Sequence, residues 1–194
     1  MRVLLLFCHP VEDSYQAALH RTARAALERA GHQVDDLDLY GEGFDPALSR
    51  AERVAYHDTD CNRQPVAGYV ERLLAAEALV LCFPTWWFGP PAMLKGFFDR
   101  VFLPGVGFHL NDDGTVTRGL THIKKIAGIV TYGRPRWTVM LMGDPPRKLV
   151  TRHLRLTAGL TTPVRYLAHY DMNASTDASR KRFLARVNRA MERF

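Results

Sequence analysis

Three short segments of this chain carry the side chains best suited to hold a ligand, and each directly follows an apolar run. In the first, Ser14 and Gln16 stand at the predicted start of a helix, where free backbone N–H groups and the helix dipole attract phosphate. In the second, two tryptophans and a phenylalanine at 86–88 could form a platform for a planar aromatic cofactor. In the third, residues 131–137, Gly133 allows close backbone approach and two arginines suit a phosphate or a carboxylate.

Each segment also has a purely structural interpretation that the sequence leaves open. Ser14 could be an ordinary helix N-cap, because serine is preferred at that position. The aromatic residues could cap the hydrophobic core or lie in a subunit interface. Tyr132 could stack on a ligand or donate to it, but its segment could equally be a plain turn with solvated arginines. His109, in a long loop, could be an acid or a solvated surface residue.

Parallel strands are predicted to bring the three segments together. Residues 3–8, 78–83 and 124–131 are mostly apolar, which is typical of strands covered by helices on both faces. Residues 33–40 and 162–172 are more polar and are predicted to be edge strands. In a doubly wound sheet of order 2-1-3-4-5, the loops after the first, third and fourth strands meet at the ligand-binding edge. The predicted fold class is therefore α/β, with five parallel strands and helices on both faces.

Helices are predicted between the strands from apolar spacing and capping residues. The predicted helical segments are 14–31, 46–56, 66–77, 92–102, 144–159 and 177–194. In the segment 92–102, Lys95, Asp99 and Arg100 are expected to lie off the apolar face. Pro84 is expected to end the strand 78–83, because proline has no N–H group for the ladder. Residues 103–115 form a long excursion that ends in an Asp-Gly turn signal.

Length and composition are those of one globular domain. The chain has 194 residues, of which 47% are hydrophobic and 24% charged, so disordered and fibrous classes are excluded and a single domain over 1–194 is expected. No apolar run reaches the ~20 residues of a membrane span, and the apolar segment after Met1-Arg2 is too short for a secretory signal. A cytoplasmic protein without stable membrane insertion is expected.

The net charge of +6 favours anionic partners, but the sequence around the basic residues argues against nucleic acid. The basic residues of the terminal helix lack interleaved exposed aromatics and any known nucleic-acid motif, so no nucleic-acid partner is expected. No metal site is predicted either, since the mixed His, Asp and Cys residues at 57–61 match no zinc spacing. The three cysteines, Cys8, Cys61 and Cys82, have no CxxC spacing and are expected to be mainly core thiols.

Known phosphate-loop motifs do not account for the first segment. Neither G-x-G-x-x-G nor G-x-x-x-x-G-K-[ST] follows the first predicted strand, so dinucleotide Rossmann and P-loop functions lose their main support.

Residues 83–101, FPTWWFGPPAMLKGFFDRV, resemble the signature of the flavodoxin-like NAD(P)H:quinone oxidoreductases. Cys8-His9-Pro10 and the segment from Ser14 to Ala18 are similar to that family's first flavin loop, and the resemblance covers nearly the whole chain. It implies a flavin-dependent NAD(P)H oxidoreductase that reduces quinones or related acceptors by two-electron hydride transfer. NADPH or NADH would be the co-substrate, and the two substrates would use one pocket in turn, giving ping-pong kinetics.

The resemblance also implies which residues bind the flavin, with the phosphate at the start of the first helix and the ring along 84–88 and 131–133. The implied residues are His9, Ser14, Tyr15, Gln16, Ala18, Pro84, Thr85, Trp86, Trp87, Phe88, Thr131, Tyr132 and Gly133. Backbone N–H groups at 132–133 would stabilise negative charge on the ring. No catalytic side chain is predicted, because Arg134-Pro135-Arg136 follows Gly133 where the long quinone reductases carry a tyrosine and a histidine.

FMN is expected, with FAD as the alternative, because the chain is shorter than the long quinone reductases and lacks their C-terminal extension. The resemblance implies a homodimer with the flavin near the subunit boundary. Two other functions remain open. Related small proteins are ancillary regulatory subunits of potassium-efflux transporters, and the basic terminal helix could make such a contact. A one-electron flavodoxin carrier is disfavoured by the positive net charge and by a phosphate loop that is not rich in serine, threonine and glycine.

Overall fold

The computed structural model describes residues 1–194 and contains a five-stranded parallel sheet in the order β2-β1-β3-β6-β7. The sheet strands are β1 (Arg2–Phe7), β2 (Gln33–Asp38), β3 (Ala78–Pro84), β6 (Lys125–Thr131) and β7 (Val164–His169). Because β4 (Phe108–Leu110) and β5 (Val116–Arg118) form a separate antiparallel hairpin, the sheet strands alone follow the predicted order 2-1-3-4-5. The predicted α/β fold class is confirmed.

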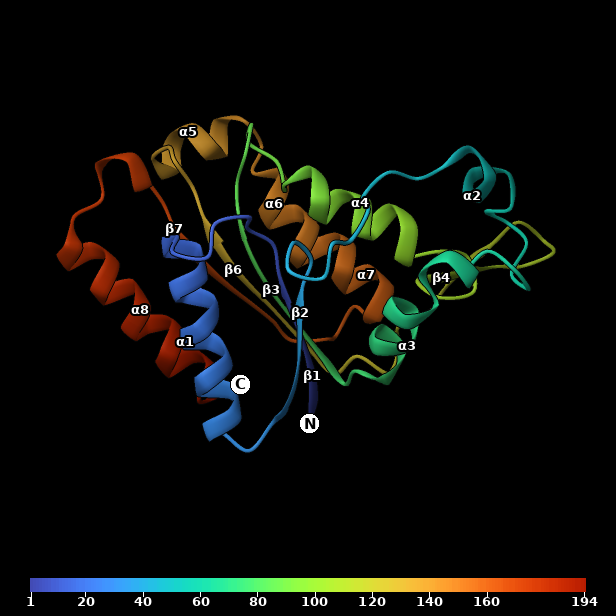
Figure 1. Ribbon diagram of the computed structural model, residues 1–194, viewed down its shortest axis with the longest axis horizontal. Helices are drawn as coiled ribbons and strands as arrows, with labels where there is room; N and C mark the ends of the chain where they lie inside the picture. Colours follow the sequence, from blue (N-terminus) through green and yellow to red (C-terminus); the bar gives the residue numbers. More distant parts are fainter.

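Helices cover both faces of the sheet (Figure 1). The long ones are α1 (Tyr15–Arg29), α3 (Ala67–Ala75), α4 (Ala92–Val101) and α8 (Asp177–Met191). The shorter ones are α2 (Arg50–Val54), α5 (Arg136–Leu141), α6 (Pro145–Lys148) and α7 (Leu154–Ala158), with 3₁₀ turns at η1 (Gln64–Val66) and η3 (Met172–Ala174) and a π-helical turn η2 (Leu149–His153). Helices α1 and α8 lie on one face, and α3, α4 and α7 lie on the other.

Alternation along each central strand divides the hydrophobic core into two layers. In β1, Leu4 and Leu6 belong to the larger buried cluster, with side chains of α3, α4 and α7, while Val3 and Leu5 belong to the cluster under α1 and α8. Strands buried on both faces need apolar side chains at every position, which is why these segments read as continuous apolar runs.

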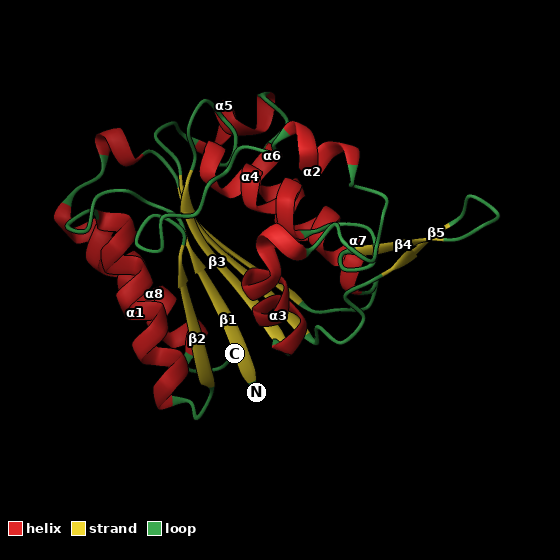
Figure 2. Cartoon of the chain, turned by 45° about the vertical axis from the view of Figure 1, so that its right-hand side comes forward, coloured by secondary structure: helices red, strands yellow, loops and turns green.

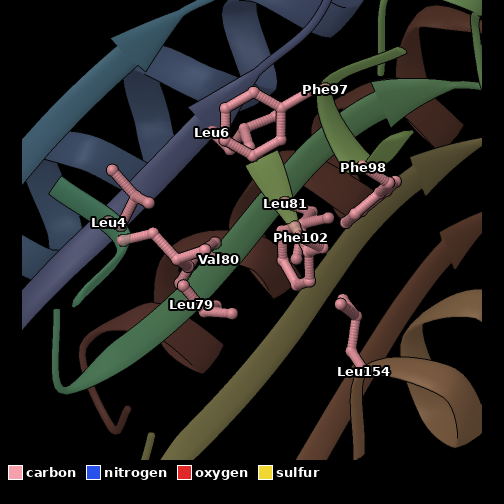
Figure 3. A pocket seen from close by; sticks show the side chains of 10 residues that line it. Leu4, Leu6, Leu79, Val80, Leu81, Phe97, Phe98, Phe102 and Leu154 are labelled. Atoms are coloured by element: carbon pink, nitrogen blue, oxygen red, sulfur yellow. The ribbon is translucent and has the colours of Figure 1, made fainter. Parts of the chain in front are cut away.

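The side chains between the sheet and α4 leave almost no space (Figure 3). Leu4, Leu6 and Leu81 meet Phe97 and Phe98 of α4 around a gap of about 10 Å³, with only apolar groups on its walls. Such a gap is at the limit of what one water molecule needs and offers that water no polar partner. It is packed core and not a ligand site.

Strand β3 includes Pro84, one residue beyond the expected end. The N–H of Cys8 donates to the carbonyl of Cys82, and the N–H of Thr85 donates to the carbonyl of Thr131 at 2.8 Å. Backbone groups of alternate residues point to opposite neighbours, so the missing N–H of Pro84 falls on the β1 side, beyond the end of β1. Pro84 therefore removes no backbone hydrogen bond from the sheet.

Three further predictions needed correction. The segment predicted as helix 46–56 is helical only over α2, and the third ligand loop, predicted without a helix, contains the short helix α5. Arg100, expected away from the buried face of α4, is only 9% exposed, because it bonds Glu52 of α2 at 2.7 Å and the carbonyl of Asp45. Long side chains can follow a partner into the interior, which apolar spacing alone does not report.

The long excursion after α4 is the β4–β5 hairpin, which projects from the body of the molecule (Figure 2). Its turn contains the predicted Asp-Gly pair, and Gly114 has a φ of 79°. None of the helices combines the length and the apolar character needed to cross a bilayer.

Candidate functional site

The three predicted ligand loops meet at the carboxyl edge of the sheet. The hydroxyl of Thr85 donates to the Thr131 carbonyl at 3.0 Å, which joins the second loop to the third. The rings of His9 and Trp86 have centroids 5.9 Å apart, which brings the first loop against the second. Because β1, β3 and β6 are parallel neighbours, their loops emerge side by side. The structure thus places together the segments that the sequence singled out.

Gln16 ties these loops to one another from inside. Its side chain is 3% exposed, and its amide donates to the Ile129 carbonyl and to the Cys82 sulfur, both at 3.1 Å. Its amide oxygen accepts a 2.8 Å hydrogen bond from the Thr131 hydroxyl. The side chain was expected as a phosphate donor, but the sheet already uses its hydrogen-bonding groups, so its observed role is structural.

The start of α1 keeps the features of an anion site. Ser14 is the N-cap and accepts a 3.1 Å hydrogen bond from the Ala17 N–H. The backbone N–H groups of Tyr15 and Gln16 have no acceptor in the protein, and they lie at the positive end of a 15-residue helix. These two donors, and not the Gln16 side chain, are what the protein offers to a phosphate.

The remaining predicted residues of the first loop frame this position. His9 is half-buried, and its Nδ1 accepts from the Val11 N–H at 3.0 Å. The Tyr15 hydroxyl donates to the Arg180 carbonyl at 2.9 Å, and burial raises the pKa of Tyr15 to about 12. Ala18 is half-buried in the first turn of α1. Tyr15 therefore stays protonated and anchors α1 to α8.

The aromatic loop contains a strained turn. Trp86 and Gly89 exchange two backbone hydrogen bonds of 3.0 Å, and the two residues between them, Trp87 and Phe88, have φ values of 51° and 59°. Hairpin turns with positive φ at both central positions normally carry glycine or asparagine, and a bulky residue there costs on the order of 1–2 kcal/mol. Such strain clusters at ligand sites. The Trp87 side chain is 99% exposed, so packing within the monomer does not offset this cost.

A hollow of about 200 Å³ lies between the second and third loops. It is lined by Thr85, Trp87, Phe88, Tyr132, Gly133, Arg134, Val139 and Asn173. Apolar and aromatic walls with a few polar groups are typical of small-molecule sites. This hollow is the candidate site for a planar ring.

Tyr132 does not present its side chain to this hollow in the way expected. It is 1% exposed, its hydroxyl donates to Asp144 at 2.7 Å and bonds Tyr166, and its ring stacks on Tyr170. Burial, with Tyr166 and Asp144 adding to it, raises the pKa of Tyr132 above its usual range. Its backbone N–H is also used, by the His169 carbonyl. Within 132–133 only the Gly133 N–H remains free for a ligand.

Asn173 also lines the hollow, although it was not among the predicted site residues. It follows β7, and the carbonyls of Tyr132 and Arg134 accept from the N–H groups of Met172 and Asp171, which fixes this loop against the third one. The sequence could have indicated Asn173 by its place directly after the last predicted strand, because the loops after all strands of a parallel sheet emerge at the same edge.

Metal and thiol chemistry have no support at this edge. No group of three or more His, Cys, Asp or Glu side chains is placed to hold a metal ion. Cys8 and Cys82 are fully buried, and burial raises the pKa of Cys8 to about 12 and raises that of Cys82 further. Both thiols are core residues, as predicted.

Comparison with protein families places the whole chain in one of them. The family model described as "Flavodoxin-like fold" matches residues 1–193. An uncharacterized NAD(P)H oxidoreductase of Escherichia coli K12, YcaK, is 37% identical over 148 residues, which cover 74% of this chain and 65% of YcaK. The NAD(P)H dehydrogenase [quinone] 1 of Cavia porcellus is 34% identical over 123 residues, which cover 55% of this chain and 45% of that enzyme. The chain thus spans about half to two thirds of the length of the curated relatives it matches.

Solved structures agree with the observed architecture. The NAD(P)H:quinone oxidoreductase of Methanothermobacter marburgensis has a TM-score of 0.83 and 26% identity, with 99% of this chain and 96% of that chain covered. Smu.1420 of Streptococcus mutans UA159 has a TM-score of 0.85 at 24% identity, with both chains fully covered, and this similarity supports the fold alone.

Proposed function

This chain belongs to the flavodoxin-like family, and on that premise we propose that it is a flavin-dependent NAD(P)H oxidoreductase acting on quinones or related acceptors. The observation that carries the proposal is the hollow between Trp87-Phe88 and Gly133, together with the Gln16–Thr131 hydrogen bond that joins the third loop to the start of α1, where two N–H groups are free. The names of the relatives, NAD(P)H oxidoreductase and NAD(P)H dehydrogenase [quinone], support the reaction class.

The residues present fit a flavin. The N–H groups of Tyr15 and Gln16, with the helix dipole behind them, would hold the phosphate, and no acidic side chain stands in the first turn of α1 to oppose it. The ring would lie in the hollow against the 86–89 turn, with the Gly133 N–H available to it. FMN is the proposed flavin, and FAD is the alternative.

When bound, a flavin supplies hydride chemistry between a reduced nicotinamide and an acceptor. The protein's own contribution is positioning. The Trp86–Gly89 hydrogen bonds and the Thr85–Thr131 bonds hold the walls of the hollow rigid, so that two flat substrates can use the same space in turn. The buried Tyr132 hydroxyl is committed to Asp144, so this side chain is not the proton donor.

A homodimer is proposed as the active form. Exposed large apolar residues gather at this edge on α5 and on the aromatic turn, among them Trp87, Trp137 and Leu141, which are 99%, 69% and 78% exposed. Exposed apolar patches beside a ligand site commonly mark interfaces. A second copy would cover this face, and Leu141→Glu would then shift the protein to monomer in sedimentation velocity; a wild-type protein that is already monomeric refutes the homodimer.

The cofactor proposal is tested on the purified protein by absorbance, with any released flavin identified by mass, and then by turnover of NADPH with the quinone menadione. Trp86→Ala should weaken flavin affinity, because the turn that walls the hollow begins at this residue. Leu160→Ala, which removes an exposed apolar side chain near the opposite edge of the sheet, is the matched control. A colourless protein that binds neither FMN nor FAD would end the proposal.

A further inference from the structure

A second hollow, of about 360 Å³, lies beside the candidate flavin site, and four of its nine lining residues are cations. Arg136, from the start of α5, faces it together with Arg147, Lys148 and Arg152, and its polar wall is completed by Thr151 and Tyr170. Its size lies within the range of small-molecule sites. We name it the basic cleft.

Cations of the basic cleft have no acidic partner in the protein. Arg136, Arg147, Lys148 and Arg152 form no ion pair, and the side chains of Arg136, Lys148 and Arg152 donate no hydrogen bond to the chain. One carboxylate, Asp144, lines the cleft, and it accepts hydrogen bonds from the hydroxyl of Tyr132 and the backbone N–H of Arg147. Four positive charges therefore surround the hollow against one negative charge, which favours an anion carrying several charges.

The fold presents these cations together by means of an unusual helix. Residues 147, 148, 151 and 152 occupy one face, because side chains four apart are neighbours on a helix. Their helix starts at Asp144, whose φ is 44° and whose carboxylate caps the first turn, and it passes through the π-helical turn η2. π-Helical turns occur frequently at functional sites.

At two other hollows, most of the cationic side chains donate hydrogen bonds to backbone carbonyls. At the hollow beside the C-terminus, Lys125 bonds the carbonyl of Phe194 and Arg165 bonds that of Ala190. At the hollow beside the β4–β5 hairpin, the single cation, Arg118, donates to the Leu156 carbonyl. The basic cleft has three cations whose side chains donate no hydrogen bond, Arg136, Lys148 and Arg152, whereas Arg193 is the one such cation at the hollow beside the C-terminus.

The basic cleft and the flavin hollow are immediate neighbours. Val139 lines the hollow and Met140 lines the cleft, so α5 divides them. Tyr132 borders the hollow and stacks on Tyr170 of the cleft, with ring centroids 4.6 Å apart. A ligand with a flat ring at one end and phosphates at the other can reach from one into the other.

We propose that the basic cleft binds the 2′-phosphate of NADPH and makes this protein selective for NADPH over NADH. The inference rests on the proposed function, because it takes the nicotinamide of the same molecule to lie in the flavin hollow. NADH carries only its central pyrophosphate, whereas NADPH adds a dianionic group at the adenosine end, and Arg147, Lys148 and Arg152 provide the charges for it.

The test uses the double variant Lys148→Gln/Arg152→Gln, because these two exposed side chains make no contact that the fold needs. Arg147 stays intact, since its guanidinium packs over the Tyr166 ring. Arg186→Gln/Arg189→Gln on α8, on the other face of the sheet, removes the same charge and is the control. Binding of adenosine 2′,5′-bisphosphate and of 5′-AMP is measured by calorimetry, and kcat/KM is measured with NADPH and with NADH.

We expect the wild type to bind the bisphosphate more tightly than 5′-AMP, and the cleft variant to lose this preference by about tenfold or more, as loss of charge-assisted phosphate contacts predicts. The NADPH to NADH ratio of kcat/KM should fall in parallel, while the control keeps both. Equal binding of the two nucleotides by the wild type, or an unchanged preference in the cleft variant, overturns the proposal. Displacement of the bisphosphate by inorganic phosphate at comparable concentration would also overturn it, since the cleft would then be a simple anion site.

The calorimetric measurement of nucleotide binding needs no bound flavin. The flavin proposal and the phosphate-site proposal can therefore fail separately. A protein that takes up no flavin but still binds the bisphosphate in the cleft refutes the oxidoreductase proposal and leaves the phosphate site standing. A flavoprotein that reduces quinones with no preference between NADPH and NADH refutes the phosphate site alone.

Discussion

Replacing Gln16 by methionine should destabilise the protein even when no ligand is present. The substitution keeps the length of the side chain but removes its donors and its acceptor. The buried Thr131 hydroxyl then loses its acceptor, at a cost of about 1–3 kcal/mol, and the amide bond to the Ile129 carbonyl is lost, at about 0.5–1.5 kcal/mol. The amide bond to the Cys82 sulfur is weak and adds little. The expected loss is about 2–4 kcal/mol, a large fraction of the stability of a typical domain.

The assay is denaturant unfolding of the flavin-free protein, with the midpoint and the slope measured for wild type and variant. Gln33→Met is the matched control, because Gln33 is exposed on the edge strand β2 and its side chain makes no hydrogen bond. The reasoning is refuted if Gln16→Met is no more destabilising than Gln33→Met. If flavin affinity fell while the stability of the flavin-free protein held, the side chain would contact the ligand, as first expected from the sequence.

Two further perturbations follow from the structure. Trp87→Gly should raise the free energy of unfolding of the flavin-free protein by about 1 kcal/mol, because it removes the positive-φ strain of a fully exposed side chain, whereas Trp86→Gly, at a residue without positive φ, should not. Denaturant midpoints decide this, and equal effects of the two variants would contradict it. Burial of Glu52 opposes its ionisation, but hydrogen bonds from Ser49 and the Arg100 guanidinium outweigh burial and hold its pKa below the usual range. Glu52→Gln should therefore cost about 3 kcal/mol at pH 7, and the difference from wild type should shrink as the pH falls below roughly 4, where the wild-type carboxylate also loses its charge. Unfolding curves at several pH values measure this, and a difference that stays constant down to pH 3 would count against the ion pair.

Much of the fold was already present in local sequence patterns. The apolar runs at 3–8, 78–83 and 124–131 are typical of strands buried on both faces, and the sheet order predicted for a doubly wound fold is the one observed. The positions of the ligand loops followed as well, because every such strand ends at the same edge. The 83–101 segment carried enough detail to indicate the family that the chain belongs to.

The direction and the partners of polar side chains were decided only in three dimensions. Gln16 and Tyr132 were assigned to the correct loops, yet their side chains turn inward, because Thr131 and Asp144 offer better-placed partners than the solvent-facing edge does. Likewise, nothing local marks Arg100 as buried, since its partner Glu52 lies 48 residues away. A hydrogen-bond partner that comes from a distant loop leaves no periodic pattern in the sequence from which it could be predicted.

The sequence by itself therefore determined the strands and the loops that follow them, because the apolar pattern of each segment depends only on its own residues. Tertiary structure alone decided which groups at the carboxyl edge of the sheet remain free: the N–H groups of Tyr15 and Gln16, the strained turn at Trp87 and the cations of the basic cleft. The physical reason is that a group is free only after all its neighbours have found their partners, and those neighbours come from distant parts of the chain.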